Sequence, residues 1–234
     1  MPKNWLATTP LILIKEDNLL NQSMKTALVV GASGLIGKHL TSKLLKSSYY
    51  EKVSVIVRKP LTIIHPKLEQ IVMDFDNLDA SKIIADDIFC CLGTTMKQAG
   101  SKEAFYKVDF TYPLTIAKAG LANGAKQFLV VSSMGADEKS LFYYSRVKGE
   151  IEKALSDLRY PTLIIFRPSM LAGKRENPRM GEKIGQVVMS FFAPLIPDNY
   201  KVIAGEKVAQ AMLELAQKGI KNKDIFVSGS LQKF

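Results

Sequence analysis

The chain has 234 residues, of which 47% are hydrophobic, enough for the core of one α/β domain. Basic residues exceed acidic ones, giving a formal net charge of +10 and an isoelectric point near 9.5. Because the charges are dispersed rather than gathered in blocks, we expect no specific nucleic-acid surface, and a basic surface around a small anionic ligand is the simpler interpretation.

Neither a membrane span nor a metal site is expected. No apolar run approaches the roughly 18 residues that a spanning helix needs, and Leu11–Ile14 is too short for a secretory signal. Cys90 and Cys91 are adjacent in an apolar run typical of a strand, where their side chains would point to opposite faces. We therefore expect a cytoplasmic protein without a disulfide framework.

Residues 1–23 differ in pattern from the rest of the chain. They contain one short apolar patch, two prolines and no clear period, and they end just before Met24. We expect an N-terminal extension over 1–23 and a single domain over 24–234. The sequence leaves open whether the extension is disordered, packed on the surface or in contact with a partner.

The first motif of the domain is T-A-L-V-V-G-A-S-G-L-I-G, from Thr26 to Gly37. Its apolar run predicts a buried parallel strand, and the glycine spacing G-x-x-G-x-x-G leads into an amphipathic helix that should end near residues 47–48. A strand, a tight turn and a helix start can hold a pyrophosphate on bare backbone N–H groups. The alternative is a plain turn. The predicted contact residues are Gly31, Ala32, Ser33, Gly34, Leu35, Ile36 and Gly37.

The second strand is predicted at Lys52–Val57, and Arg58 and Lys59 follow it. In this kind of fold the end of the second strand faces the adenosine ribose, where a basic residue accepts the 2′-phosphate of NADP and an acidic one binds the 2′-hydroxyl of NAD. The two basic side chains therefore favour NADP over NAD. A basic turn facing solvent is the alternative.

The third and fourth strands end in further candidate contacts. Leu68–Met73 is followed by Asp74 and Phe75, which either contact an adenine ring or begin a helix from Leu78 with Asp74 as its N-cap. The fourth strand, Asp87–Leu92, leads into a glycine and a threonine at the edge where ligands collect in open α/β sheets. The contacts predicted there are Leu92, Gly93 and Thr94.

The rest of the chain continues the alternation of helices and strands. The predicted elements are a crossover helix at Ser101–Asn123, bent at Pro113, a strand at Gln127–Val131, a helix from Phe142 to Leu158, a strand at Thr162–Phe166, a helix at Ala209–Lys218 and an edge strand at Ile225–Val227. This rhythm predicts an α/β, doubly wound parallel sheet, Rossmann-like, with a small C-terminal portion on the substrate side.

A candidate proton-transfer site lies in the helix after the fifth strand. Tyr144 and Lys148 are four residues apart, so both side chains project from one face of the helix. An ammonium beside a phenol favours the phenolate, which makes tyrosine a usable general acid or base. Ser133, at the end of the fifth strand, can add a hydroxyl to the same carbonyl oxygen. The alternative is an exposed helix pair; Tyr143, four residues before Val147, is expected to pack.

Four motifs in this order resemble the short-chain dehydrogenase/reductase superfamily, and more narrowly its atypical branch around the Tat-interacting oxidoreductase-like proteins. They are the glycine turn, the pair Ser132 and Ser133, the spacing Tyr144-x-x-x-Lys148 and the run Arg167, Pro168, Ser169. The resemblance covers roughly residues 25–234. It implies NADP bound across the strand ends, Tyr144 as acid/base, Lys148 holding the ribose and lowering the tyrosine pKa, and Ser133 orienting a carbonyl. It also implies that Pro168 and Ser169 pass near the nicotinamide.

The chain departs from the family pattern at one position. Many members place an asparagine in the helix after the fourth strand to support a proton relay, whereas Asp109 is the nearest candidate here, and it either replaces that relay or marks its absence. Downstream, Gly173–Gly181 is either a lid or a surface loop. The apolar segment Ile184–Ile196 could line the pocket, cover it or form a dimer face.

These patterns predict an NADP-dependent oxidoreductase that acts on a small carbonyl or alcohol substrate. The alternative is an NADP-binding redox sensor with little or no turnover, which passes its occupancy to a regulatory protein partner; a homodimer is also compatible with the sequence. A sugar-nucleotide epimerase or dehydratase is less favoured, because the short C-terminal part leaves little room for a nucleotide-sugar subdomain.

Overall fold

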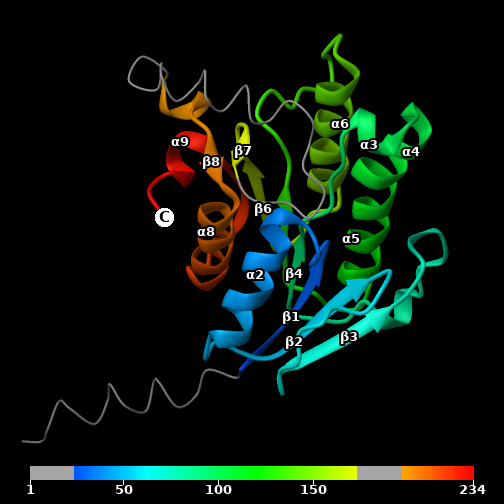
Figure 1. Ribbon diagram of the computed structural model, residues 1–234, viewed down its shortest axis with the longest axis vertical. Coiled ribbons are helices and arrows are strands. Elements are labelled where there is room, and N and C mark those ends of the chain that lie inside the picture. The colour runs from blue at the N-terminus through cyan, green and yellow to red at the C-terminus, as the bar shows by residue number, and fades with distance from the viewer. Residues whose placement is uncertain (1–23, 173–196) are drawn as a thin grey trace, which may run out of the picture.

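A computed structural model describes residues 24–172 and 197–234 of the chain. Seven parallel strands form one sheet in the order β3-β2-β1-β4-β5-β6-β9 (Figure 1). The strands are β1 (Lys25–Val30), β2 (Tyr50–Val57), β3 (Leu68–Val72), β4 (Asp87–Cys90), β5 (Gln127–Val131), β6 (Thr162–Arg167) and β9 (Asn222–Val227). The order reverses between β1 and β4, so the predicted doubly wound, Rossmann-like sheet is confirmed.

Helices cover both faces of the sheet (Figure 1). One face carries α2 (Leu35–Lys46) and α8 (Gly205–Gln217). The other carries α4 (Lys102–Tyr106), the π-helical segment η3 (Lys107–Thr111), α5 (Tyr112–Ala122) and α6 (Tyr143–Asp157). The shorter elements are α3 (Met96–Ala99), α9 (Ser228–Leu231), the 3₁₀ turns η1 (Phe75–Asn77), η2 (Ala80–Lys82) and η5 (Asp198–Tyr200), and the strand pair β7 (Leu171–Ala172) and β8 (Ile203–Ala204).

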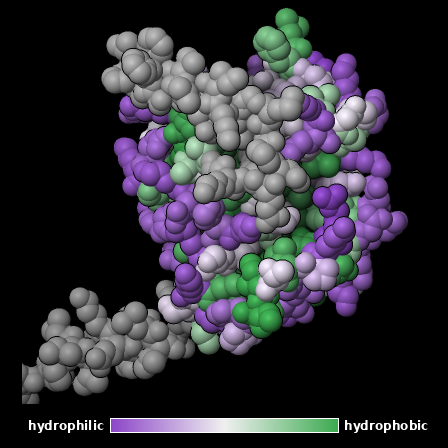
Figure 2. Space-filling model, in the orientation of Figure 1, coloured by the Kyte–Doolittle hydropathy of each residue, from purple (hydrophilic) through white to green (hydrophobic). Residues whose placement is uncertain are grey.

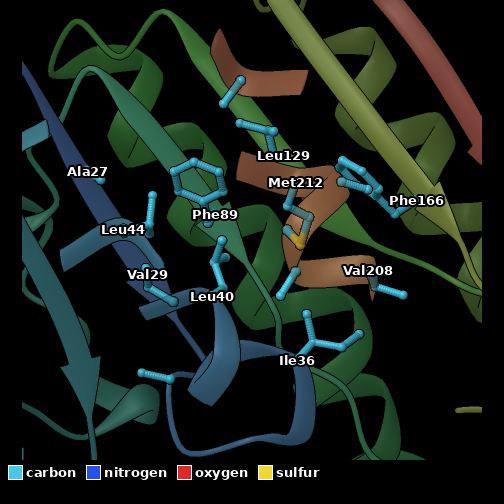
Figure 3. Packing of buried hydrophobic residues seen from close by; sticks show 14 of the residues in the cluster. Ala27, Val29, Ile36, Leu40, Leu44, Phe89, Leu129, Phe166, Val208 and Met212 are labelled. Atoms are coloured by element: carbon cyan, nitrogen blue, oxygen red, sulfur yellow. The ribbon is translucent and has the colours of Figure 1, made fainter. Parts of the chain in front are cut away.

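The core is divided by the sheet into two apolar clusters. Successive residues of a strand point to opposite faces, so Val29 packs toward α2 and α8 while Leu28 packs toward α5 and α6. On the first face Leu40 of α2 meets Met212 of α8 above the strands, and both side chains are fully buried (Figure 3). Burial of each such side chain stabilises the fold by roughly 1.5–3 kcal/mol.

Several elements differ from the sequence predictions, including α8, which begins at Gly205 instead of Ala209, and β2, which begins at Tyr50 instead of Lys52. β4 ends at Cys90 instead of Leu92, because the chain leaves the ladder after Cys91 N–H donates to Val30 O at 2.8 Å. No helix begins at Leu78; two 3₁₀ turns, capped by Asp74 and Asp79, fill that connection. The crossover helix is continued through a π-helical segment before Pro113. β9 begins three residues earlier than predicted, at Asn222, where it pairs in parallel with β6.

Apolar side chains are exposed at several places on the described part of the chain, among them Ile64 and the loop that precedes α6. Figure 2 shows hydrophobic atoms at the tip of the loop that precedes α6, where Leu141 and Phe142 are 95% and 79% exposed. Within residues 24–172 and 197–234 there is no helix with the length and hydropathy to cross a bilayer. The predicted extension 1–23 lies outside the described residues, as do the predicted lid or loop at 173–181 and the apolar segment up to Ile196.

Candidate functional site

The glycine turn after β1 is closely packed against the end of β4. Gly31 has φ of +84°, and a Cβ there would lie 2.7 Å from the carbonyl carbon of Cys91. A Cβ at Gly37 would lie 2.2 Å from the oxygen of Gly31, so only glycine lets the helix approach the turn this closely. Gly34 is the N-cap of α2, and its N–H donates to Gly31 O at 2.9 Å.

The first turn of α2 is open to an anion. No side chain caps it, and its first turn holds no acidic residue. The N–H groups of Leu35 and Ile36 therefore have no partner from a capping side chain, and the helix dipole adds partial positive charge at this end. This is the geometry in which helix N-termini bind phosphate groups.

A cleft of about 660 Å³ extends from this turn along the carboxyl ends of the strands. Ligands of open α/β sheets collect at this edge, where the strand order reverses. Of the predicted contacts, the cleft is lined by Ser33, Gly34, Leu35, Ile36, Leu92, Gly93, Thr94, Ser132, Ser133, Tyr144, Lys148, Pro168 and Ser169. The structure thus gathers the glycine turn, the strand ends and the Tyr-Lys pair around one cavity.

Tyr144 and Lys148 lie one turn apart on α6 and differ in exposure. Tyr144 is 36% exposed, and its ring packs against buried Phe105 with centroids 5.5 Å apart. Lys148 is 4% exposed, so its ammonium depends on partners inside the protein. Tyr143, expected to pack, also contacts Phe105, and its hydroxyl donates to Lys102 O.

Asp109 is the partner of the buried ammonium. Its Oδ1 lies 2.7 Å from Lys148 Nζ, and its Oδ2 accepts a hydrogen bond from Thr94 N at 2.9 Å. Burial is the largest influence on the pKa of Lys148 and lowers it, but the Asp109 carboxylate, Tyr144 and Cys90 together raise it, so the net shift is upward and the side chain stays an ammonium. The position that the sequence left open therefore holds a paired carboxylate.

Two other predicted contacts, Ser132 and Arg167, belong to a network around Glu152. Arg167 forms a two-pronged pair with the Glu152 carboxylate, which also accepts from Ser132 Oγ. The hydrogen-bonded Glu152 raises the pKa of Arg167 further. The Arg167 guanidinium is thus held away from the cleft, which it does not line.

The ends of β2 and β3 lie outside this cleft. Arg58 and Lys59 are exposed directly after β2, at the edge where the sequence places a 2′-phosphate. Asp74 accepts a hydrogen bond from Asp76 N as a cap, and Phe75 is buried against Tyr112, so the structure favours the capping alternative for this pair. Gly31, Ala32 and Gly37 shape the turn from below the cleft.

Several lining residues were not singled out from the sequence. Lys38 and His39 occupy the second turn of α2, one turn beyond the glycines, a spacing that could have indicated them. Gln98 comes from α3, and Cys91 lies beside the end of β4. Met134, Met170 and Leu171 form an apolar side of the cleft, which only the tertiary structure brings together.

The residues fit a dinucleotide of the nicotinamide type. Gly31 and Gly37 leave no space for Cβ atoms, no side chain caps the start of α2, and the cleft continues to a buried ammonium and a phenol. A diphosphate at the turn would leave the far end of the ligand beside the Tyr-Lys pair.

Known proteins agree with this geometry. A sequence profile described as NAD(P)H-binding matches residues 31–218. Protein HTATIP2 of Rattus norvegicus is 37% identical over 81% of this chain and 78% of its own length. The mitochondrial protein FMP52 of Candida glabrata is 38% identical over 68% of this chain and 69% of its own.

Solved structures share the fold at low sequence identity. MoeE5 in complex with UDP-glucuronic acid and NAD has a TM-score of 0.70 at 17% identity, covering 87% of this chain and 76% of that one. The UDP-N-acetylglucosamine 4-epimerase of Methanobrevibacter ruminantium M1 has a TM-score of 0.67 at 18% identity, with the same coverages. The chain belongs to the NAD(P)H-binding Rossmann family, among the atypical short-chain dehydrogenase/reductase-like proteins related to HTATIP2 and FMP52.

Proposed function

We propose that the chain is an NADP-dependent oxidoreductase that interconverts a carbonyl group and an alcohol. The observation that carries this proposal is the shared cleft, in which the glycine turn, Ser133, Tyr144 and Lys148 all take part. A binding module would need only the turn. A phenol and a hydroxyl at the far end of the same cavity supply the groups that a proton transfer needs.

Each group has a role in the proposed reaction. The N–H groups at the start of α2 bind the diphosphate, and Lys148 donates to the ribose hydroxyls. When bound, NADPH supplies the hydride from its nicotinamide ring. Tyr144 gives a proton to the carbonyl oxygen in reduction and takes it back in oxidation. Ser133 Oγ, which donates to Met134 O at 3.0 Å, turns to bond the same oxygen.

The choice of NADP over NAD rests on the end of β2. Arg58 and Lys59 are exposed there, and neither forms an ion pair with a described residue. The residues that follow β2 directly include no carboxylate to bind a 2′-hydroxyl. Both cations are therefore available to a 2′-phosphate.

Substitution Tyr144→Phe tests the reaction. The variant removes the proton donor and keeps the ring on Phe105, so NADPH oxidation across a panel of small aldehydes and ketones should fall by about 10²–10⁴-fold. NADPH affinity, measured by fluorescence titration, should stay nearly unchanged. Tyr143→Phe, on the neighbouring residue, is the matched control and should retain turnover.

The outcome also decides between the enzyme and the sensor. If the parent protein binds NADPH but oxidises it with no carbonyl of the panel, the redox-sensor alternative replaces the enzyme. The cytoplasmic location stays a prediction beside fungal relatives whose names are mitochondrial, and cell fractionation of the full chain tests it.

A further inference from the structure

Asp109 stands in a local break of the helical pattern. Pro113 has no N–H to donate to the carbonyl of Asp109, four residues before it, and the preceding turn widens to a π-helical segment in which Tyr112 N–H donates to Lys107 O. The widened turn presents the Asp109 side chain to the cleft, where it is 1% exposed.

The carboxylate joins three elements that are far apart in the sequence. One oxygen contacts Lys148 of α6, and the other accepts from Thr94 in the loop after β4. Gly93 lies directly beside the pair, since a Cβ built there would be at ordinary contact distance, 3.6 Å from Asp109 Oδ1 and 3.8 Å from Lys148 Nζ. One oxygen is therefore held by an ion pair with the ammonium, and the other by a backbone hydrogen bond.

We propose that Asp109 is a positioning residue, which holds the Lys148 ammonium and the Gly93–Thr94 turn against each other so that both meet the cofactor in a fixed place. The proposal rests on the proposed function in one respect only, namely that Lys148 takes part in the reaction. The pairing itself is a property of the folded chain.

A carboxylate suits this place and an amide does not. Two donors, the ammonium of Lys148 and the N–H of Thr94, meet two acceptor oxygens. Asparagine offers one oxygen and an NH₂ group, so one of the two contacts would become donor against donor. The residue at 109 therefore does not reproduce the asparagine of the usual relay; it anchors the lysine.

The anchored lysine keeps donors for a ligand. An ammonium has three N–H groups, and a single contact with Asp109 leaves two for ribose hydroxyls or for Tyr144. Since the ion pair is neutral overall, Lys148 acts mainly by directing its N–H donors at the ligand and less through its charge. The groups that act on its ammonium are Asp109 from η3, Tyr144 from α6 and Cys90 from β4.

The test compares Asp109→Asn with the parent protein by NMR on ¹³C-labelled lysine, with the Lys148 signal assigned by Lys148→Arg. In the parent protein the pKa of Lys148 should lie above the usual value for a lysine. In Asp109→Asn its titration midpoint should fall by about one pH unit or more, because the opposing charge is gone. NADPH affinity should weaken at least about tenfold, since the lysine and the Thr94 turn lose their common anchor.

The matched control is Asp157→Asn on the same α6. Its carboxylate pairs with Lys153 at 3.3 Å but is exposed, and this variant should move neither the Lys148 midpoint nor NADPH affinity. A folded Asp109→Asn protein with an unchanged Lys148 midpoint overturns the proposal. Both measurements are made without turnover, so a failed Tyr144→Phe test leaves this result readable.

If Asp109→Asn does not fold, the double variant Asp109→Leu with Lys148→Met decides the question. Removing one partner leaves a buried charge alone, whereas removing both leaves none. The double variant should therefore have a higher thermal midpoint than the single variant Lys148→Met, in which Asp109 is left without its partner. A double variant that melts below both single variants contradicts the pairing.

Discussion

Two arginines near the strand ends differ in whether they have an ion-pair partner within the protein. Arg167 is bound by both oxygens of Glu152, so its charge is used within the protein. Arg58 stands exposed after β2 and has no ion-pair partner among the described residues. The first stabilises the packing of α6 on β6, and the second is available to an anionic ligand.

Charge reversal at Arg58 tests the cofactor preference. Arg58→Glu should weaken NADP binding by about tenfold or more, on the order of 1.4 kcal/mol, because a carboxylate would face the 2′-phosphate. NAD has no such phosphate and should lose far less affinity. Isothermal titration with both nucleotides measures the difference.

The control for that experiment is Lys126→Glu. Lys126 is exposed just before β5, at the amino ends of the strands and so on the opposite edge of the sheet, and its reversal changes the net charge equally. Equal losses for NADP and NAD in Arg58→Glu would contradict the preference for NADP.

Single residues also illustrate which features of the candidate site could be predicted from the sequence. Tyr144 and Lys148 could be placed on one helix face from their spacing alone. The partner of Lys148 could not, because the position of Asp109 depends on a π-helical segment that no periodicity indicates. Arg167 was assigned to the ligand from its motif, and its pairing with Glu152, fifteen residues earlier, follows only from tertiary packing.

Among the elements, α6 provides Tyr144 and Lys148 of the candidate site, and a glycine allows it to pack closely on the preceding loop. Tyr144, Lys148 and Glu152 follow one another at intervals of four, so they form one line along the helix. A Cβ at Gly149 would lie 2.1 Å from the backbone nitrogen of Glu138 and 2.2 Å from the carbonyl carbon of Asp137. The helix therefore touches the loop 137–138 at backbone distance.

Gly149→Ala should displace α6 from this loop. Overpacking of this kind costs about 1–3 kcal/mol, which exceeds the gain of up to about 1 kcal/mol in helix propensity. Thermal unfolding should show the loss of stability, and NADPH affinity should fall because Lys148 moves with the helix.

Lys153→Ala provides the comparison, since Lys153 is exposed on the same helix and its pair with Asp157 lies at the surface. It should leave both stability and affinity nearly unchanged. If Gly149→Ala is as stable as the parent protein, the close contact with residues 137–138 does not constrain the helix.

Elements with a strong pattern were predictable, and those set by long-range contacts were not. The apolar runs of β1, β2, β5 and β6 identified them as buried parallel strands. β9 was predicted with only three residues, because its first half, Asn222–Asp224, is polar and exposed and owes its strand conformation to pairing with β6. The turns η1 and η2, each begun by an aspartate N-cap, occupy the connection where a helix from Leu78 was one alternative.

Over the whole molecule, groups with raised pKa values make the fold sensitive to alkali. Burial raises the pKa of Tyr50 and of Tyr160 above the usual value of 10. The pKa values of Lys25 and Lys148 are also raised, because Asp87 with Tyr49 at Lys25, and Asp109 with Tyr144 and Cys90 at Lys148, together exceed the lowering by burial. Above about pH 10 the unfolded chain loses these protons while the native chain keeps them, so stability falls as pH rises.

Urea unfolding between about pH 8 and pH 11.5 should show this loss. Each buried tyrosine adds a slope of about 1.4 kcal/mol per pH unit above about pH 10. Tyr160→Phe should reduce the slope of the unfolding free energy against pH by the contribution of one proton. Tyr200→Phe, which removes an exposed phenol, should not. A Tyr160→Phe slope equal to that of the parent protein would contradict the buried-phenol explanation.

The packing of α8 on α2 has a consequence for synthesis of the chain. Gly205 begins α8 against Leu35, and Glu206 pairs with Lys43, so the first helix of the domain is covered by almost the last. A nascent polypeptide emerging from the ribosome presents the apolar face of α2 long before its cover exists. During that interval the leucines of α2 are exposed and can bind chaperones. Once the finished chain is released, α8 packs on α2 and buries them.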